Sequence, residues 1–171
     1  MRRTPTIIVP LRRYRGVPYR VATLVALALL AAGTNSAWAE KPPFKVATIQ
    51  FNPELKVLGK NVDALAERFE QAAKSGAKII VAPEMATTGY LYLNRTDIAK
   101  FVETIPGPTT QRFEKIASKY GCYLAWGMPE RDATTGLFYN SAAIVGPEGF
   151  VGKYRKTHLW ESEAHWSAWG D

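Results

Sequence analysis

Apolar residues recur with two different periods in the part of the chain that follows residue 44. The runs KVATIQF (45–51) and AKIIVA (77–82) are short and largely apolar, which predicts two strands, and we expect 45–51 to be buried on both faces. Between these runs the spacing predicts a helix from Gly59 that ends at Gly76 in a left-handed cap. Its apolar face consists of Val62, Leu65, Phe69, Ala72 and Ala73. Strand, helix and strand within about forty residues form a βαβ unit, which implies parallel strands.

The second half of the chain continues the same alternation of helices and strands. Thr96–Phe101 favours a short helix, and 109–121 predicts a helix that ends at Gly121. Residues 122–130 read as a strand, and 137–146 with 150–156 form a hairpin around Pro147 to Gly149. The face of the second long helix is formed by Phe113, Ile116, Ala117 and Tyr120. The order predicts an α/β fold with a mixed sheet.

Charged residues follow several of these strands. Glu84 and Glu130 come at the ends of strands, and Lys156 ends the hairpin. Open α/β sheets place functional groups at the carboxyl ends of their strands. A carboxylate packed on apolar strand residues gains proton affinity, which suits a general acid or base, and a lysine nearby can stabilise an anion. The alternative is that Glu84 only caps a turn and Lys156 is a solvated surface charge.

Net charge does not indicate a polyanionic partner. The chain carries a formal charge of +7, with 22 basic and 15 acidic residues. Six of the basic residues are arginines within 1–39, a stretch that has no acid, so 22 − 6 = 16 basic residues face 15 acidic ones in the remainder. A nearly neutral body gives nucleic acid no basic patch to bind, and we expect no nucleic-acid partner.

Residues 1–39 have the layout of a secretory signal peptide. A basic region precedes the apolar run VATLVALALLAAG (21–33), which is short for a membrane span, and Ala37-Trp38-Ala39 resembles a cleavage site. We therefore expect cleavage after Ala39, export to the periplasm or the medium, and no stable membrane association afterwards. The alternative is an N-terminal membrane anchor. The chain is therefore expected to consist of a signal peptide at 1–39 and one mature domain at 40–171.

Four ordered blocks of the mature chain resemble the nitrilase superfamily of carbon–nitrogen hydrolases. KVATIQF resembles the first strand of the family, and AAKSGAKIIVAPEMATTGY resembles the block with its catalytic glutamate, which falls on Glu84. GPTTQRFEKIASKYGCYLAWGMPERD resembles the next helix and strand. YNSAAIVGPEGFVGKYRKTHLW resembles the hairpin with the catalytic lysine, which falls on Lys156. A further family glutamate is matched best by Glu163, with Glu161 as the alternative.

The resemblance implies an α-β-β-α sandwich of the nitrilase type that is incomplete, with its C-terminal third missing. It implies a Glu-Lys-Cys triad that hydrolyses a small nitrile, amide or carbamoyl substrate and needs no metal or organic cofactor. The full-length form is expected to be a homo-oligomer. In the family the nucleophilic cysteine follows the lysine, so we expect it beyond residue 171 and expect this chain alone to be inactive.

Cys122 does not suit the nucleophile's role. It precedes Lys156 and stands beside apolar residues, so the sequence predicts a small buried thiol. This leaves a second hypothesis, a non-catalytic exported binding protein on a degenerate sandwich. The membrane-bound acyltransferase branch of the superfamily is a third, but it requires several spanning helices.

Other residues near the motifs have less specific predictions. Thr87, Thr88 and Gly89 are expected to form the turn that aims Glu84, and Tyr90 to shape the pocket. The C-terminal tryptophans are predicted as core or subunit contacts, with a pocket wall as the alternative: Trp160, Trp166 and Trp169. His158 is predicted as a local hydrogen-bond partner, since His158 and His165 are too few for a zinc site.

Overall fold

The computed structural model describes residues 43–170, so the predicted signal peptide at 1–39 lies outside the described residues. Within the described part no helix is both long and apolar enough to cross a bilayer. The strands are β1 (Lys45–Thr48), β2 (Ala77–Val81), β3 (Tyr123–Arg131), β4 (Phe138–Gly146) and β5 (Gly149–Arg155). The helices are α2 (Leu58–Lys74), α3 (Arg95–Ile98), α4 (Pro108–Tyr120) and the 3₁₀ turn η1 (Glu161–His165).

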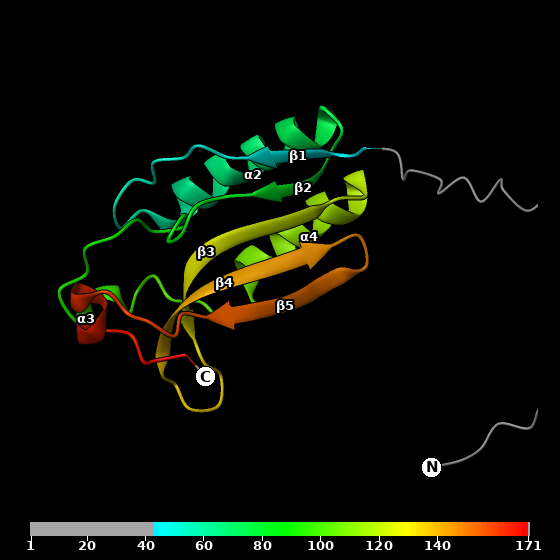
Figure 1. Cartoon of the computed structure of the whole chain (residues 1–171). Coiled ribbons are helices and arrows are strands. Elements are labelled where there is room, and N and C mark those ends of the chain that lie inside the picture. Colours follow the sequence, from blue (N-terminus) through cyan, green and yellow to red (C-terminus); the bar gives the residue numbers. More distant parts are fainter. Residues whose placement is uncertain (1–42, 171) are drawn as a thin grey trace, which may run out of the picture. The chain divides into compact units, whose positions relative to one another are not determined.

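The predicted mixed sheet is confirmed. The five strands lie in the order β1-β2-β3-β4-β5 (Figure 1). β2 pairs in parallel with β1 and with β3, as a βαβ unit requires, and β4 pairs antiparallel with β3 and with β5. The hairpin prediction for β4 and β5 is therefore confirmed as well. This order places the carboxyl ends of β2 and β5 on either side of the paired strands β3 and β4.

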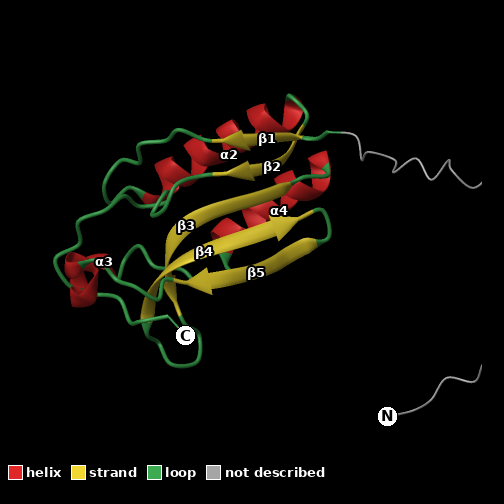
Figure 2. Cartoon of the chain, in the orientation of Figure 1, coloured by secondary structure: helices red, strands yellow, loops and turns green. Residues whose placement is uncertain are grey.

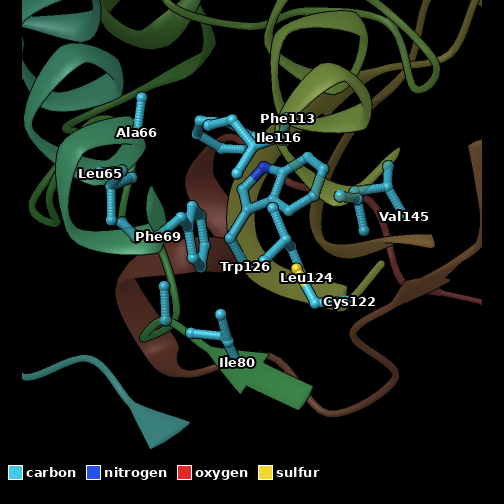
Figure 3. Close-up of a cluster of buried hydrophobic side chains, with 14 of the residues drawn as sticks. Leu65, Ala66, Phe69, Ile80, Phe113, Ile116, Cys122, Leu124, Trp126 and Val145 are labelled. Atoms are coloured by element: carbon cyan, nitrogen blue, oxygen red, sulfur yellow. The ribbon is translucent and has the colours of Figure 1, made fainter. Parts of the chain in front are cut away.

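Helices α2 and α4 lie on the same side of the sheet (Figure 2). Their predicted apolar faces pack there on alternate residues of the strands, such as Ile80, Leu124 and Trp126 (Figure 3). Phe113 makes edge-to-face contacts with the rings of Phe69 and Trp126, at centroid distances of 5.0 and 4.7 Å. Each fully buried side chain of this kind contributes about 1.5–3 kcal/mol, so this layer is the main source of stability in the described residues.

Both predicted glycine caps are confirmed. Gly76 has a φ of 90° and its N–H bonds to the carbonyl of Ala73, while Gly121 has a φ of 60° and bonds to the carbonyl of Ala117. Only glycine adopts these left-handed angles without a steric penalty on Cβ. The two helices therefore end where the sequence predicts, and the chain turns directly into β2 and β3.

The expectation that 45–51 is a strand buried on both faces is wrong. β1 ends at Thr48 and is the edge strand, and Val46 is 65% exposed. The reason is that side chains alternate along a strand and the helices cover one face only. The other face exposes large apolar side chains along the sheet: Val46, Ile79, Val81, Tyr123, Ile144 and Tyr154.

Two short elements also differ from the prediction. The helix expected at Thr96–Phe101 is a single turn, α3, that begins one residue earlier because the Asn94 side chain accepts a hydrogen bond from the Asp97 N–H at 3.0 Å. The turn η1 was not predicted, since a five-residue 3₁₀ segment leaves no clear periodicity.

Candidate active site

The turn after β2 presents Glu84 on the sheet face that the helices leave open. Gly127 of β3 makes this approach possible, because a Cβ there would lie 2.5 Å from the Glu84 Cα. Backbone bonds fix the turn on both sides, from the Gly127 N–H to the Pro83 carbonyl and from the Ala86 N–H to the Gly127 carbonyl. Next to Glu84, Met85 has a left-handed φ of 49°. The predicted turn is confirmed, with Gly89 at a φ of 74° and its N–H bonded to the Met85 carbonyl.

Lys156 and Asn140 reach the same place from the antiparallel half of the sheet. Lys156 directly follows β5, and its N–H bonds to the carbonyl of Asn140 in β4 at 2.8 Å. Asn140 lies opposite Pro129 of β3, on the face that carries Ala142 and Ile144. Both side chains are therefore held by regular strand pairing, which fixes their directions.

Glu163 arrives from η1 and is buried. Its carboxylate accepts a hydrogen bond from the Trp160 N–H at 2.7 Å, which closes the turn as a capping box. The side chain is 3% exposed, whereas that of Glu84 is 42% exposed. The neighbouring Glu161 is exposed, so the structure places Glu163 rather than Glu161 beside the lysine.

These four side chains, which we call the Glu84 cluster, form a closed ring of hydrogen bonds. Lys156 Nζ lies 2.8 Å from Glu84 Oε1 and 2.8 Å from Glu163 Oε2. Asn140 Nδ2 lies 2.7 Å from Glu84 Oε1 and 2.6 Å from Glu163 Oε1. A separation of Glu84 and Lys156 beyond about 8 Å would have contradicted a shared catalytic role, because such groups act within hydrogen-bond reach of one substrate.

The expected rise in the proton affinity of Glu84 is wrong. Burial raises the pKa of its carboxyl, but hydrogen bonds from Lys156, Tyr90 and Asn140 outweigh burial and leave the pKa below its ordinary value. For Lys156, burial lowers the pKa, and the bonds to Glu163 and Glu84 outweigh it and raise the pKa. Burial and the bond to Glu84 raise the pKa of Tyr90. At neutral pH the cluster therefore holds an ionised Glu84 against a charged Lys156, with a neutral phenol beside them.

A cavity of about 340 Å³ opens in front of the cluster. Small residues of the open face make room for it, namely Ala125, Gly127 and Ala142. Glu84, Asn140 and Lys156 contribute its polar groups. A cavity with an apolar wall and a few convergent polar groups suits a small polar ligand. Trp160 and Trp169 are exposed and do not line it, and Trp166 is buried beside Tyr92, as the core prediction requires.

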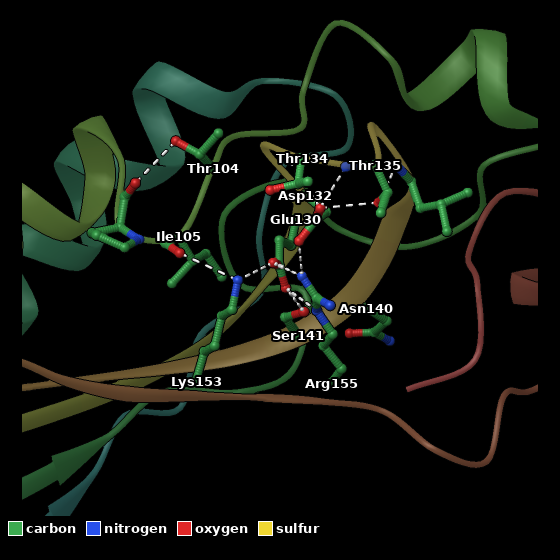
Figure 4. A network of polar contacts seen from close by, with 12 residues as sticks. Thr104, Ile105, Glu130, Asp132, Thr134, Thr135, Asn140, Ser141, Lys153 and Arg155 are labelled. Atoms are coloured by element: carbon green, nitrogen blue, oxygen red, sulfur yellow. Dashed lines mark hydrogen bonds and ion pairs between the residues drawn. The ribbon is translucent and has the colours of Figure 1, made fainter. Parts of the chain in front are cut away.

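A second group of charges, the Glu130 cluster, joins side chains of β3, β4 and β5 (Figure 4). Glu130 alternates along β3 with the open-face residues Ala125 and Gly127, so it lies on the helix side of the sheet. Glu130 is fully buried and binds Lys153 and Arg155, with Arg155 Nη2 at 2.6 Å from Oε1 and the Ser141 hydroxyl at 2.6 Å from Oε2. Arg155 also binds Asp132, the fifth member. Glu130 is thus at a strand end, as predicted, but on the helix side of the sheet and apart from Glu84.

The remaining predicted residues are placed as follows. Cys122 is fully buried in the core, where burial raises the pKa of its thiol in spite of Lys78, so it is the inert thiol that the sequence predicts (Figure 3). His158 Nδ1 lies 3.0 Å from the Thr157 hydroxyl, which confirms its local role. Within residues 43–170 no group of three or more histidine, cysteine or acidic side chains has the arrangement of a metal site.

Asn140 is the site residue that sequence reasoning missed. Its signal is the sequence YNSA, in which an apolar strand carries an amide between an aromatic and a small residue. A buried amide needs hydrogen-bond partners, so this position could have indicated a polar site on β4.

Comparison with known proteins supports the same reading of the sequence. A family model described as carbon–nitrogen hydrolase matches residues 45–169. A nitrilase from Pyrococcus abyssi is 38% identical over 128 residues, which are 74% of this chain and 48% of that protein. A protein N-terminal amidase from Saccharomyces cerevisiae is 35% identical over 128 residues, 71% of this chain and 28% of that protein.

Solved structures show the same fold. A crystal structure of an N-terminal amidase superposes with a TM-score of 0.64 at 34% identity, over 72% of this chain and 30% of that chain. The α/β arrangement of five strands and their helices is therefore part of the nitrilase-type fold. The chain spans less than half the length of each of these three relatives.

Proposed function

The chain belongs to the carbon–nitrogen hydrolase family of the nitrilase superfamily, and from this premise we propose that it is part of an enzyme that hydrolyses non-peptide carbon–nitrogen bonds. The substrate is a small nitrile, amide or carbamoyl compound. The contact of 2.8 Å between Lys156 Nζ and Glu84 Oε1 carries the proposal, because residues 72 positions apart meet as a charged pair at an open cavity. The activity is proposed for the whole protein, of which this chain spans a part.

Glu84 is the general base in this proposal. Its ionised carboxylate takes the proton of a cysteine thiol, and the thiolate sulfur attacks the amide carbon. The carbonyl oxygen becomes an oxyanion, which the Lys156 ammonium stabilises. When the carbon–nitrogen bond breaks, the proton held by Glu84 passes to the nitrogen and ammonia leaves. Water then adds to the thioester with Glu84 again as base, and the acid and the thiol are released.

Glu163 has a different role, because it is buried and its carboxylate is already bound by Lys156, Asn140 and the Trp160 N–H. Both of its oxygens are therefore bound within the protein, and Glu163 is not among the residues that line the cavity. It keeps the ammonium of Lys156 charged and directed toward Glu84. We therefore propose that Glu163 positions the lysine.

The nucleophile is expected beyond residue 171. Cys122 is fully buried among core residues on the helix side of the sheet, whereas Glu84 faces the cavity on the other side. A thiol there has no route to the Glu84 carboxylate. The proposal accordingly assigns no catalysis to residues 1–171 alone, and it requires neither a metal nor an organic cofactor.

The test is ammonia release by the protein expressed from the complete reading frame, on a panel of short nitriles and amides. Lys156→Met removes the oxyanion's partner and is expected to lower kcat by about 10²–10³-fold. Glu161→Gln is the matched control, since this exposed glutamate stands two residues from Glu163 and outside the cluster. Turnover by Lys156→Met at the wild-type rate would contradict the proposal.

A non-catalytic exported binding protein is the second candidate. The burial of Cys122, the one cysteine of the printed sequence, favours it over catalysis by this chain. It predicts that a complete reading frame encodes no further thiol near the Glu84 cluster and that amides bind without release of ammonia. Calorimetry together with the ammonia assay separates the two candidates.

Export is also proposed, on the basis of the basic and apolar layout of residues 1–39. Fractionation of expressing cells is expected to place the mature protein in the periplasm or the medium, with an amino terminus at Glu40. Recovery of the protein in the cytosol or membranes with residues 1–39 attached would contradict export.

A further inference from the structure

Asn140 contacts both carboxylates of the Glu84 cluster through a single nitrogen atom. Its Nδ2 donates to Glu84 Oε1 at 2.7 Å and to Glu163 Oε1 at 2.6 Å. An amide nitrogen has two N–H groups, and both are used here. The orientation of the amide is thereby fixed, because its oxygen in the same place would face two carboxylate oxygens and repel them.

The backbone of Asn140 is held as firmly as its side chain. Its N–H donates to the Ser167 hydroxyl at 3.0 Å, and its carbonyl accepts the N–H of Lys156 at 2.8 Å. The residue lies in β4 and is 3% exposed. A side chain on a paired strand with both backbone groups bonded has little freedom to reorient, which suits a residue that sets the geometry of its neighbours.

The charges explain what the amide contributes. Glu84 and Glu163 face one ammonium, so the cluster has one more carboxylate than cations. A second lysine in place of Asn140 would neutralise the surplus and weaken the hold of Lys156 on Glu84. An amide supplies two donors and no charge, and hydrogen bonds to ionised groups are among the stronger ones.

We propose that Asn140 is a positioning residue that holds Glu84 and Glu163 on either side of Lys156 and leaves Glu84 Oε2 to accept the proton of the nucleophile. This rests on the proposed role of Glu84 as general base. Both the lysine and the amide bond to Oε1 of Glu84, so the two oxygens of this carboxylate have different surroundings. Glu84 Oε2 is thus the atom that accepts the proton, and the amide of Asn140 orients the carboxylate.

The test titrates Glu84 directly and needs no turnover. The side-chain carboxyl carbon of Glu84 is followed by ¹³C NMR in the whole chain and assigned with Glu84→Gln. The groups that face Glu84 are Lys156 beyond β5, Asn140 in β4, Tyr90 in its own loop and Glu163 in η1. Asn140→Leu has nearly the same shape but no donor, and we expect the midpoint of the Glu84 titration to move to higher pH.

The matched control is Ser141→Ala, the next residue of the strand. Ser141 points to the other face and donates to Glu130, so its loss is expected to leave the Glu84 midpoint unchanged. If Asn140→Leu does not fold, Asn140→Ser replaces it, since a hydroxyl keeps one donor but is too short to bridge two carboxylates. A folded Asn140 variant with the wild-type midpoint would overturn the proposal.

Kinetics of the complete protein provide a second readout. Asn140→Leu is expected to lower kcat by about tenfold to a hundredfold, with a smaller change in KM. The acid limb of its pH profile should move to higher pH, because Glu84 must be ionised to act as base. If the protein hydrolyses no amide or nitrile, the proposed function fails while the NMR shift still decides the role of Asn140. If hydrolysis is normal and both the shift and the kcat effect are absent, only the Asn140 proposal fails.

Discussion

A glutamate bound by basic side chains lies on each face of the sheet, Glu130 of β3 on the helix side and Glu84 of the turn after β2 on the open side, and the two groups differ in what surrounds them. In the Glu130 cluster the carboxylate is fully buried on the helix side, and its oxygens are taken up by Arg155, Lys153 and Ser141. In the Glu84 cluster the first glutamate is 42% exposed at a cavity of about 340 Å³. A carboxylate whose oxygens are all bound and hidden stabilises the fold, whereas one that remains accessible is available for chemistry.

The two neighbours Arg155 and Lys156 show how the sequence achieves this separation. Successive residues of a strand point to opposite faces, so Arg155 binds Glu130 while Lys156 binds Glu84. The Glu130 cluster joins β3, β4 and β5 on one face and so helps to fix their register. That register sets the position of Lys156, whose side chain lies on the other face. The difference between the clusters is therefore one of burial and access rather than of residue type.

Removal of the two glutamates should affect stability very differently. Glu130→Gln removes the buried carboxylate that binds both Lys153 and Arg155, and Arg155 then keeps Asp132 as its anion. This change is expected to lower the free energy of unfolding by about 3–5 kcal/mol. Glu84→Gln breaks a partly exposed pair and is expected to cost less than about 1 kcal/mol. Urea unfolding followed by far-UV circular dichroism measures both, with Glu161→Gln as the surface control. An equal or larger loss for Glu84→Gln would remove the distinction between the clusters.

Gly127 offers a way to displace the Glu84 cluster alone. In Gly127→Ala the new Cβ would lie 2.5 Å from the Glu84 Cα, so the turn after β2 must move. The expected cost is about 1–3 kcal/mol in the free energy of unfolding. Gly152→Ala in β5 is the matched control, because a Cβ there meets no atom within 4 Å.

In Gly127→Ala the distance between Glu84 and Lys156 is expected to increase, so the midpoint of the Glu84 titration should move to higher pH. This shift is the structural readout. The Gly152→Ala control is expected to change the free energy of unfolding by less than about 0.5 kcal/mol and to leave this titration unchanged. If both variants behave alike, the close approach of the turn to β3 does not hold Glu84 in place.

Acid should weaken the fold through the Glu130 cluster. Burial raises the pKa of Glu130, but bonds from Arg155, Lys153 and Ser141 outweigh it and leave the pKa below its ordinary 4.5. The folded chain therefore binds fewer protons than the unfolded chain in acid, and stability falls as the pH drops below about 4.5 and through the lowered pKa. Above that range the contribution is complete.

Unfolding free energies measured between pH 7 and about pH 3 check this expectation. The decline should be smaller in Glu130→Gln, which has lost the group responsible, than in the wild-type chain. If stability falls as much in Glu130→Gln as in the wild-type chain, other carboxylates cause the loss of stability in acid. Asp132 is one such group, since bonds from Thr135 and Arg155 lower its pKa.

Much of the fold follows from local patterns in the sequence. The helix faces with Phe69 and Phe113, the caps at Gly76 and Gly121 and the β4–β5 hairpin are all where the pattern predicts them. The failure at β1 has a physical reason: an apolar run shows that side chains avoid water, but it does not show what covers them. The open face of the sheet is apolar, and within the described residues the helices lie only on the other face.

The site was predictable only in part. Glu84 and Lys156 follow from strand ends and family blocks. Of the two candidates for the further glutamate, the structure places the buried Glu163 against Lys156, whereas Glu161 is exposed. The lowered pKa of Glu84 depends on hydrogen bonds from Lys156, Tyr90 and Asn140. Lys156 and Asn140 reach Glu84 from distant parts of the sequence, and no local pattern predicts that contact. Glu130 looked equivalent to Glu84 because strand position does not specify the face.

The most direct test of the central claim is the reactivity of a thiol beside Glu84. The protein from the complete reading frame is alkylated with iodoacetamide at neutral pH, and the modified cysteine is identified by mass spectrometry. The account predicts a fast-reacting cysteine encoded after residue 171 that slows markedly in Glu84→Gln, while Cys122 stays unmodified in the folded protein. Alkylation at the same rate in wild type and Glu84→Gln, or a folded protein with no reactive thiol, would contradict it.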